Sequence, residues 1–211
     1  MKILWVNSNF MHPTTKGGQI RTLEMLRHLH RRHEIHYVAI KGEPEGPARA
    51  GEYSTRNYPV RHEIPAKGKP AFLMQLAKGF FNPVPLAVSR FHPPSLGPFL
   101  EDLIQRERFD RAVVDHLAPT AYFPRLDRAV FFQHNVETVI WRRHVEHCSS
   151  PVRKIYFKKQ ADLMFEYERR VCQKAGHIVA VSDVDAGEMK RLFGVTRISA
   201  IPTGVNLEYF A

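Results

Sequence analysis

The sequence predicts an α/β fold, a doubly wound and Rossmann-like sheet that is mostly parallel and flanked by helices. Short apolar runs of strand length alternate along the chain with amphipathic segments of helical period. The runs are rich in Val, Ile and Phe and lack in/out alternation, which is typical of parallel strands buried on both faces. With 211 residues, 44% of them hydrophobic, the chain has the length of one domain with a sizeable core.

Each element follows from its own pattern. Six apolar runs are expected as strands: Ile3–Val6, Ile35–Ile40, Ala112–Val114, Ala129–Phe132, Ile178–Val181 and Ile198–Ile201. Apolar stripes at three- and four-residue steps predict helices over Ile20–Leu29, Phe99–Ile104 and Val152–Ala175. The segments Gly42–Pro70 and Pro83–Pro98 are rich in Gly or Pro and are expected as loops, with one weak strand at Val60–Ile64 and a helix at Ala71–Phe81 between them.

The last strand–helix unit carries both helix signals. Ser182 with Asp185 forms a capping box that opens a short helix after the strand Ile178–Val181. Gly194 follows the helix as its expected C-terminal cap.

Charge and cysteine content limit the environment and the partners. Thirty-one Lys and Arg against 21 Asp and Glu give a net charge of +10, which implies an anionic partner. Nucleic acid is not expected, because the basic residues are scattered over several helices and no helix-turn-helix, zinc or RNP signature accompanies them. Cys148 and Cys172 have no metal-ligand spacing and suit unpaired thiols in a cytoplasmic protein.

The residues that carry chemistry are expected to follow the strands, because parallel sheets bind ligands at the carboxyl ends of their strands. Gly17 and Gly18 end the loop after the first strand and open a helix, where bare backbone N–H groups could meet a phosphate or sugar oxygen. The same pair is also compatible with a simple flexible turn.

Two histidines and a carboxylate follow neighbouring strands. Asp115 and His116 come after one strand, and His134 and Asn135 after the next, so all face one crevice if these strands pair. An imidazole placed there can hydrogen-bond a hydroxyl or take its proton near neutral pH. The alternative is that His134 merely caps the following helix.

Taken together, these pieces resemble the N-terminal domains of family 4 glycosyltransferases of the GT-B fold. The resemblance rests on Gly17–Thr22, Phe132–Asn135, Val179–Ser182 and, above all, the stretch Ile201–Phe210. That stretch is similar to the family's Pro-Asn-Gly-Val connector between two Rossmann-like domains, with Thr203 in place of the usual Asn.

The resemblance implies a retaining transfer of a hexosyl group from a nucleotide sugar to a saccharide or lipid-linked acceptor, with no essential metal or other cofactor. It places Gly17 and Gly18 near the donor diphosphate and the acceptor, and it gives His134 a catalytic contact with the transferred sugar and the acceptor. Arg21, Asp115, His116 and Asn135 are expected to bind acceptor or donor, and Thr203 and Gly204 to lie near the diphosphate.

The resemblance also implies a division of the protein. Residues 1–201 would form the acceptor-side domain and 202–211 the start of the connector, with the donor-binding domain absent after Ala211. The chain alone is then expected to lack transferase turnover, since the groups that neutralise a leaving diphosphate are missing. A non-enzymatic α/β module that binds a phosphorylated or anionic ligand is the alternative.

Two further features need a structural explanation. The histidines His28, His30, His33 and His36, with His144 and His147, are expected to lie on the surface and not to bind metal. The apolar segment Phe72–Phe81 lies near Lys67, Lys69 and Lys78, so it is compatible with peripheral contact with an anionic membrane or with ordinary helix packing.

Overall fold

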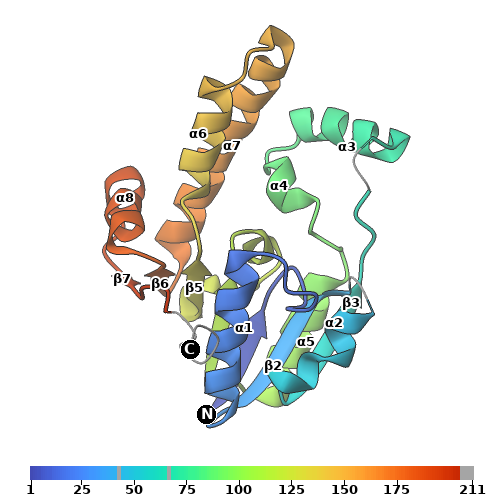
Figure 1. Cartoon of the computed structure of the whole chain (residues 1–211), viewed down its shortest axis with the longest axis vertical. Helices are drawn as coiled ribbons and strands as arrows, with labels where there is room; N and C mark the ends of the chain where they lie inside the picture. The colour runs from blue at the N-terminus through green and yellow to red at the C-terminus, as the bar shows by residue number, and fades with distance from the viewer. Residues whose placement is uncertain (42–43, 66–67, 205–211) are drawn as a thin grey trace, which may run out of the picture.

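A computed structural model describes residues 1–41, 44–65 and 68–204 and contains one seven-stranded sheet (Figure 1). Every pairing in the sheet is parallel, and the strand order is β3-β2-β1-β4-β5-β6-β7. The strands are β1 Lys2–Val6, β2 Glu34–Lys41, β3 Arg56–Arg61, β4 Arg111–Asp115, β5 Val130–Gln133, β6 His177–Ala180 and β7 Ile198–Ala200. The predicted doubly wound, Rossmann-like class is confirmed.

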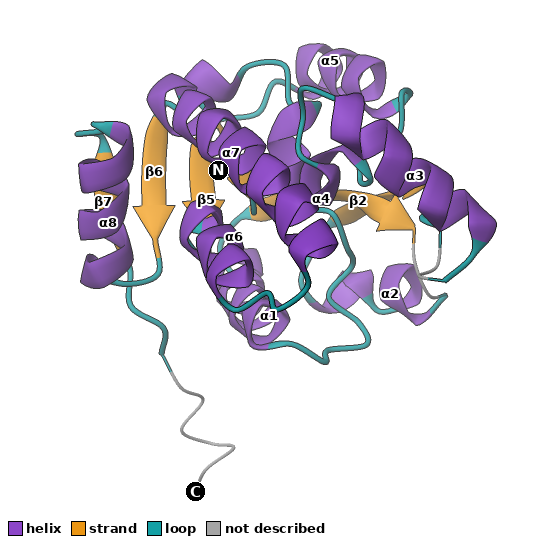
Figure 2. Ribbon diagram, turned by 90° about the horizontal axis from the view of Figure 1, so that it is seen from above, coloured by secondary structure: helices purple, strands orange, loops and turns teal. Residues whose placement is uncertain are grey.

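Helices cover the sheet on its faces (Figure 2). They are α1 Gly17–His30, α2 Glu45–Ala48, α3 Pro70–Phe81, α4 Leu86–Ser89, α5 Leu96–Glu107, α6 Glu137–Glu146, α7 Pro151–Lys174 and α8 Asp183–Phe193. Three short 3-10 turns lie at Ala50–Glu52, Ala118–Ala121 and Leu126–Arg128. The helices α6 and α7 run side by side and rise away from the sheet (Figure 1).

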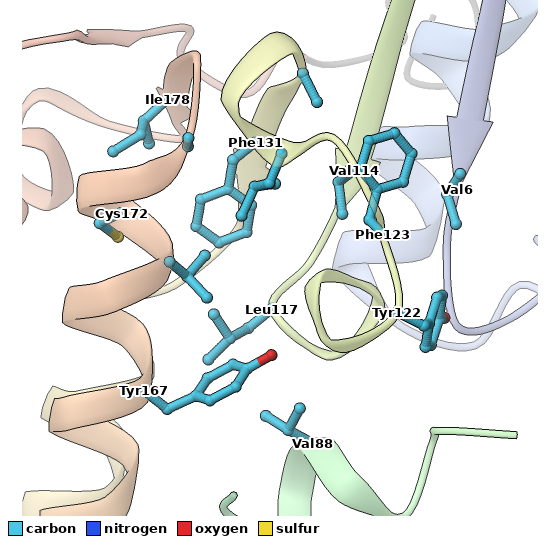
Figure 3. Packing of buried hydrophobic residues seen from close by; sticks show 14 of the residues in the cluster. Val6, Val88, Val114, Leu117, Tyr122, Phe123, Phe131, Tyr167, Cys172 and Ile178 are labelled. Carbon is cyan, nitrogen blue, oxygen red and sulfur yellow. The ribbon is translucent and has the colours of Figure 1, made fainter. Parts of the chain in front are cut away.

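The core has two parts because successive residues of a strand point to opposite faces. In β1, Ile3 and Trp5 pack into the cluster beneath α1, whereas Leu4 and Val6 pack into the larger cluster on the other face. Figure 3 shows part of that larger cluster, in which residues of β1, β4 and β5 meet side chains of α7. A strand buried on both faces has no polar side, which explains the absence of alternation in the sequence.

The sheet reverses its order between β1 and β4, which is the topological switch point of a doubly wound fold. β1 pairs with β4 through Val6 and Val114, and β4 pairs with β5 through Asp115 and Phe132. The residues that follow β1, β4 and β5 are therefore neighbours at one edge of the sheet.

The two segments expected as loops contain more structure than their composition indicates. Within Gly42–Pro70 lie α2 and β3, and within Pro83–Pro98 lie α4 and the first turn of α5. The weak strand expected at Val60–Ile64 is instead β3, which begins earlier, at Arg56. β3 is an edge strand with a half-exposed pattern and an internal Pro59, so its apolar signal is weak.

The last unit agrees with its predicted helix signals. The backbone N–H of Asp185 donates to Ser182 Oγ at 3.1 Å, which caps α8. Gly194 ends the helix with a φ of +67°, a conformation that glycine adopts without strain.

The histidine prediction is right for some residues and wrong for one. His28, His144 and His147 are exposed. His36 is completely buried, with its ring nitrogens 2.9 Å from Tyr58 Oη and 2.8 Å from Glu34 Oε1. A histidine within a strand that is buried on both faces satisfies its nitrogens locally, which the cluster pattern did not indicate.

In the part of the chain that the structure describes, every helix is too short or too polar to cross a membrane.

Candidate active site

An open cleft of about 920 Å³ lies at the switch point. Its walls come from the loop after β1, from α1 and α4, and from the residues that follow β4 and β5. Of the residues predicted from sequence, those that line the cleft are Gly17, Gly18, Arg21, His116, His134, Asn135 and Thr203. Asp115 lies fully buried beneath the histidines, and Gly204 is exposed outside the lining. The rest of the predicted connector, 205–211, lies outside the described residues.

Asp115 is the centre of a buried hydrogen-bond network. Its Oδ2 accepts from Trp5 Nε1 at 3.0 Å, Asn7 Nδ2 at 2.7 Å and Thr22 Oγ1 at 3.0 Å, and its Oδ1 lies 2.8 Å from His134 Nε2. Burial acts to raise the pKa of Asp115, but the nearby imidazoles and the bonds from His134 and Trp5 outweigh it and hold the pKa below its usual value. Asp115 therefore stays ionised and fixes the ring of His134.

The bond to Asp115 determines which atom of His134 faces the cleft. Because the carboxylate accepts at Nε2, the Nε2–H tautomer is favoured and Nδ1 is left with a free lone pair. A Cβ added at Gly18 would lie 3.3 Å from that Nδ1, so glycine allows α1 to begin against the ring. The alternative that His134 caps the next helix is wrong, because the backbone N–H groups at the start of α6 donate to Glu168.

His116 stacks on His134, with ring centroids 4.0 Å apart and an interplanar angle of 20°. Its φ of +71° places a non-glycine residue in the left-handed region, a conformation that a single residue at a functional site often holds at some cost. Burial lowers the pKa of His116 to about 4, helped by His134 and Lys16 and opposed by Asp115. The ring is therefore neutral at physiological pH.

Arg21 connects the cleft to the end of the sheet. Its guanidinium lies over the ring of Phe132, 4.9 Å from the centroid, and Nη2 donates to the carbonyl of Ile201. Burial lowers the pKa of Arg21, although Asp115 opposes the shift. Nη1 is buried and has no hydrogen-bond partner among the described residues. Arg21 thus anchors the chain just before Thr203.

A second buried carboxylate was missed by the sequence reasoning. Glu168 of α7 is fully buried and accepts from the backbone N–H of Glu137 at 2.9 Å and of Thr138 at 2.7 Å. It also accepts from Thr138 Oγ1 at 2.6 Å and Gln133 Nε2 at 3.2 Å. The sequence does contain a signal for this residue. Glu168 falls between Met164 and Val171 on the apolar stripe of α7, and a charged group on a buried stripe requires hydrogen-bond partners.

The ligand atoms of Asp115, His116 and His134 lie within 4.8 Å of one another, which is the spacing of a metal site. Asp115 Oδ1 is already bonded to His134 Nε2, so an ion that used this oxygen would compete with that bond. The second oxygen of Asp115 carries three donors. The network is satisfied as it stands.

Comparison with known proteins decides the family. The model of Glycosyltransferase Family 4 matches residues 15–209, nearly the whole chain. The chain belongs to Glycosyltransferase Family 4. A search of curated protein sequences found no match.

Solved structures agree with the glycosyltransferase fold. The fold is similar to that of UGT71G1 of Medicago truncatula complexed with UDP-glucose, with a TM-score of 0.52 and 11% identity, over 98% of this chain and 52% of that one. A UGT transferase of Siraitia grosvenorii in complex with UDP gives the same TM-score of 0.52 at 11% identity, over 98% and 52%. The family 4 chain thus has the Rossmann-like architecture of GT-B proteins and spans about half the length of these two.

Proposed function

We propose that this chain is the acceptor-side half of a GT-B glycosyltransferase that moves a hexosyl group from a nucleotide sugar to a saccharide or lipid-linked acceptor, with retention of configuration. The observation that carries the proposal is the Asp115–His134 pair, which lies under a cleft at the carboxyl ends of β4 and β5. Family membership supports the reaction class.

In this proposal His134 binds the acceptor hydroxyl. Asp115 holds Nε2–H, so Nδ1 accepts a hydrogen bond from the hydroxyl and increases its nucleophilicity. If His134 takes up a proton, Asp115 also stabilises the imidazolium that forms. The neutral His116 ring stacks on His134 and limits its rotation. Asn135 and Thr203 line the same cleft and supply further polar contacts.

The positive side of the cleft suits the phosphates of the donor. The helix α1 begins at Gly17, so its first backbone N–H groups and the positive end of its dipole lie beside Lys16 and Arg21. Arg21 Nη1 is buried and has no hydrogen-bond partner among the described residues, so the guanidinium adds positive charge to this side of the cleft. A diphosphate placed there would be near the hydroxyl bound by His134.

We propose that residues 1–201 form the acceptor-side domain and that the connector begins at 202. The two solved structures are about twice as long as this chain, which supports a second, donor-binding domain. Turnover is then expected only when both halves are present. The test compares residues 1–211 with a protein that carries this chain and its donor-binding domain, using a nucleotide sugar and NMR of the product anomer. Robust transfer by residues 1–211 alone, or an inverted product, would overturn the proposal.

We also propose that transfer needs no metal, because the Asp115 network is satisfied without one. Turnover should be unchanged by EDTA. A loss that Mg²⁺ or Zn²⁺ restores would contradict this.

A peripheral membrane contact is proposed through α3. Its inner side contacts α7, where Gln160 Nε2 donates to the Gly79 carbonyl at 3.0 Å. Its outer side exposes Met74, Phe80 and Phe81, the last at 85%. Of the nearby lysines, Lys69 and Lys78 are exposed and Lys67 lies outside the described residues. Co-sedimentation with anionic liposomes, lost in Phe81→Ser, tests the contact; equal sedimentation with neutral liposomes would count against it.

A further inference from the structure

Glu137 lies on the wall of the cleft, in the first turn of α6 and three residues after His134. A carboxylate at a helix start is ordinarily stabilised as an anion by the backbone N–H groups of that turn. Here those groups are taken, because the N–H groups of Glu137 and Thr138 both donate to Glu168. Glu137 therefore lines the cleft while the N–H groups that would stabilise its carboxylate are bonded to Glu168.

The two acids, Glu137 and Glu168, differ in their hydrogen-bond partners. Burial raises the pKa of Glu168, but the acid receives four hydrogen bonds, from Gln133, Glu137 and the backbone and side chain of Thr138, and these stabilise its ionised form. Burial and then the neighbouring charge of Glu168 raise the pKa of Glu137 to about 7. Glu137 therefore carries its proton below neutral pH and loses it above.

We propose that Glu137 is a pH-dependent gate for anionic ligands in the cleft: its neutral form admits and hydrogen-bonds a phosphate oxygen, and its ionised form repels it. This inference rests on the proposed anion-binding role of the cleft. The charged and titratable groups on the surrounding elements are Glu168 of α7, His134 after β5, His116 after β4, Arg21 of α1, and His12 and Lys16 of the loop after β1. The cations among them attract a phosphate, and Glu137 lines the same cleft.

The nearby histidines do not account for the expected difference in the pH dependence of anion binding. The pKa of His116 lies at about 4, so its charge does not change between pH 6 and pH 8.5. His134 and His12 are present in both the wild type and a variant of Glu137, and only the acid at position 137 differs. The comparison of the two proteins therefore isolates Glu137.

The experiment measures binding of inorganic pyrophosphate to residues 1–211 at pH 6 and pH 8.5, with Glu137→Gln as the variant. Glutamine keeps the size and a hydrogen-bond donor and cannot ionise. Relative to the variant, the wild type should lose roughly tenfold in affinity between the two pH values, the size of one added charge at short range. Pyrophosphate also changes its protonation with pH, but it does so equally for both proteins, so this effect drops out of the comparison.

Glu146→Gln, at the exposed far end of α6, is the matched control and should behave as the wild type. Glu137→Ala serves as a second non-ionising variant if the glutamine variant does not fold. Equal pH dependence in wild type and Glu137→Gln, or no pyrophosphate binding at pH 6, would overturn the inference. If the gate is found but a protein with both domains transfers no sugar, the proposed function fails and the gate remains.

Discussion

Two buried carboxylates, Asp115 and Glu168, are built alike and differ in what surrounds them. Each is completely buried and each accepts hydrogen bonds from several donors. Asp115 faces two imidazoles, and its pKa lies below the usual value. For Glu168, burial outweighs the donors and its pKa is raised, with Glu137 beside it. Burial acts to raise the pKa of both acids, and only beside the imidazoles of His116 and His134 is it outweighed.

The largest effect is expected from Asp115→Asn. The amide cannot accept from His134 Nε2–H and from Trp5, Asn7 and Thr22 together, so the ring of His134 loses its tautomer and orientation. Turnover of a protein that carries both domains should fall by about a hundredfold or more. Asp102→Asn, at an exposed carboxylate on α5, is the control and should be unchanged. An active Asp115→Asn enzyme would remove the pair from the mechanism.

The next effect concerns stability. Glu168→Gln places an amide NH₂ against N–H donors of α6 and should reduce the free energy of unfolding by about 2–3 kcal/mol. Glu166→Gln, exposed on the same helix, should cost little. Chemical denaturation measures both. If the two variants were equally stable, Glu168 would not be the support of α6 described above.

The pH dependence of stability separates the two regions. The pKa of Glu137 is raised from its ordinary value of 4.5 to about 7, so the folded state binds a proton that the unfolded state releases. Stability from this group is therefore full below pH 4.5 and lost as the pH rises through 7, by about 3 kcal/mol. Glu137→Gln should flatten the stability curve in that window. A curve of unchanged slope would show that Glu137 titrates normally.

A smaller effect is expected at Gly18. The Cβ of Gly18→Ala would press on His134 Nδ1, the atom proposed to receive the acceptor hydroxyl. Turnover should fall by about tenfold, which corresponds to about 1.4 kcal/mol, with little loss of stability. Gly187→Ala in α8, where a Cβ meets no atom within 4 Å, is the control. Full activity in Gly18→Ala would place the hydroxyl elsewhere.

The sequence was sufficient to predict most of the sheet, because strands that are buried on both faces appear in it as continuous apolar runs. β3 was misplaced, since an edge strand with Pro59 carries little of that signal. The short helix α4 lies among prolines and is held from outside, by Gln160 of α7, which no local pattern encodes.

The candidate site was predictable where its residues directly follow a predicted strand. Asp115, His116 and His134 follow paired strands, so their convergence follows from topology. The donors Trp5, Asn7 and Thr22 come from β1 and α1 and are fixed by tertiary packing. Glu137 and Glu168 are 31 residues apart and meet only because α6 folds back on α7, so the raised pKa of Glu137 could not be inferred from the sequence.

In the proposed reaction His134, held by Asp115, binds the acceptor hydroxyl. The most direct test is His134→Ala in a protein that carries this chain and its donor-binding domain, with turnover and the free energy of unfolding measured on the same sample. Turnover should fall by about a hundredfold or more, while the free energy of unfolding changes by about 1–2 kcal/mol. Unchanged turnover, or a loss of turnover fully explained by unfolding, would contradict the account.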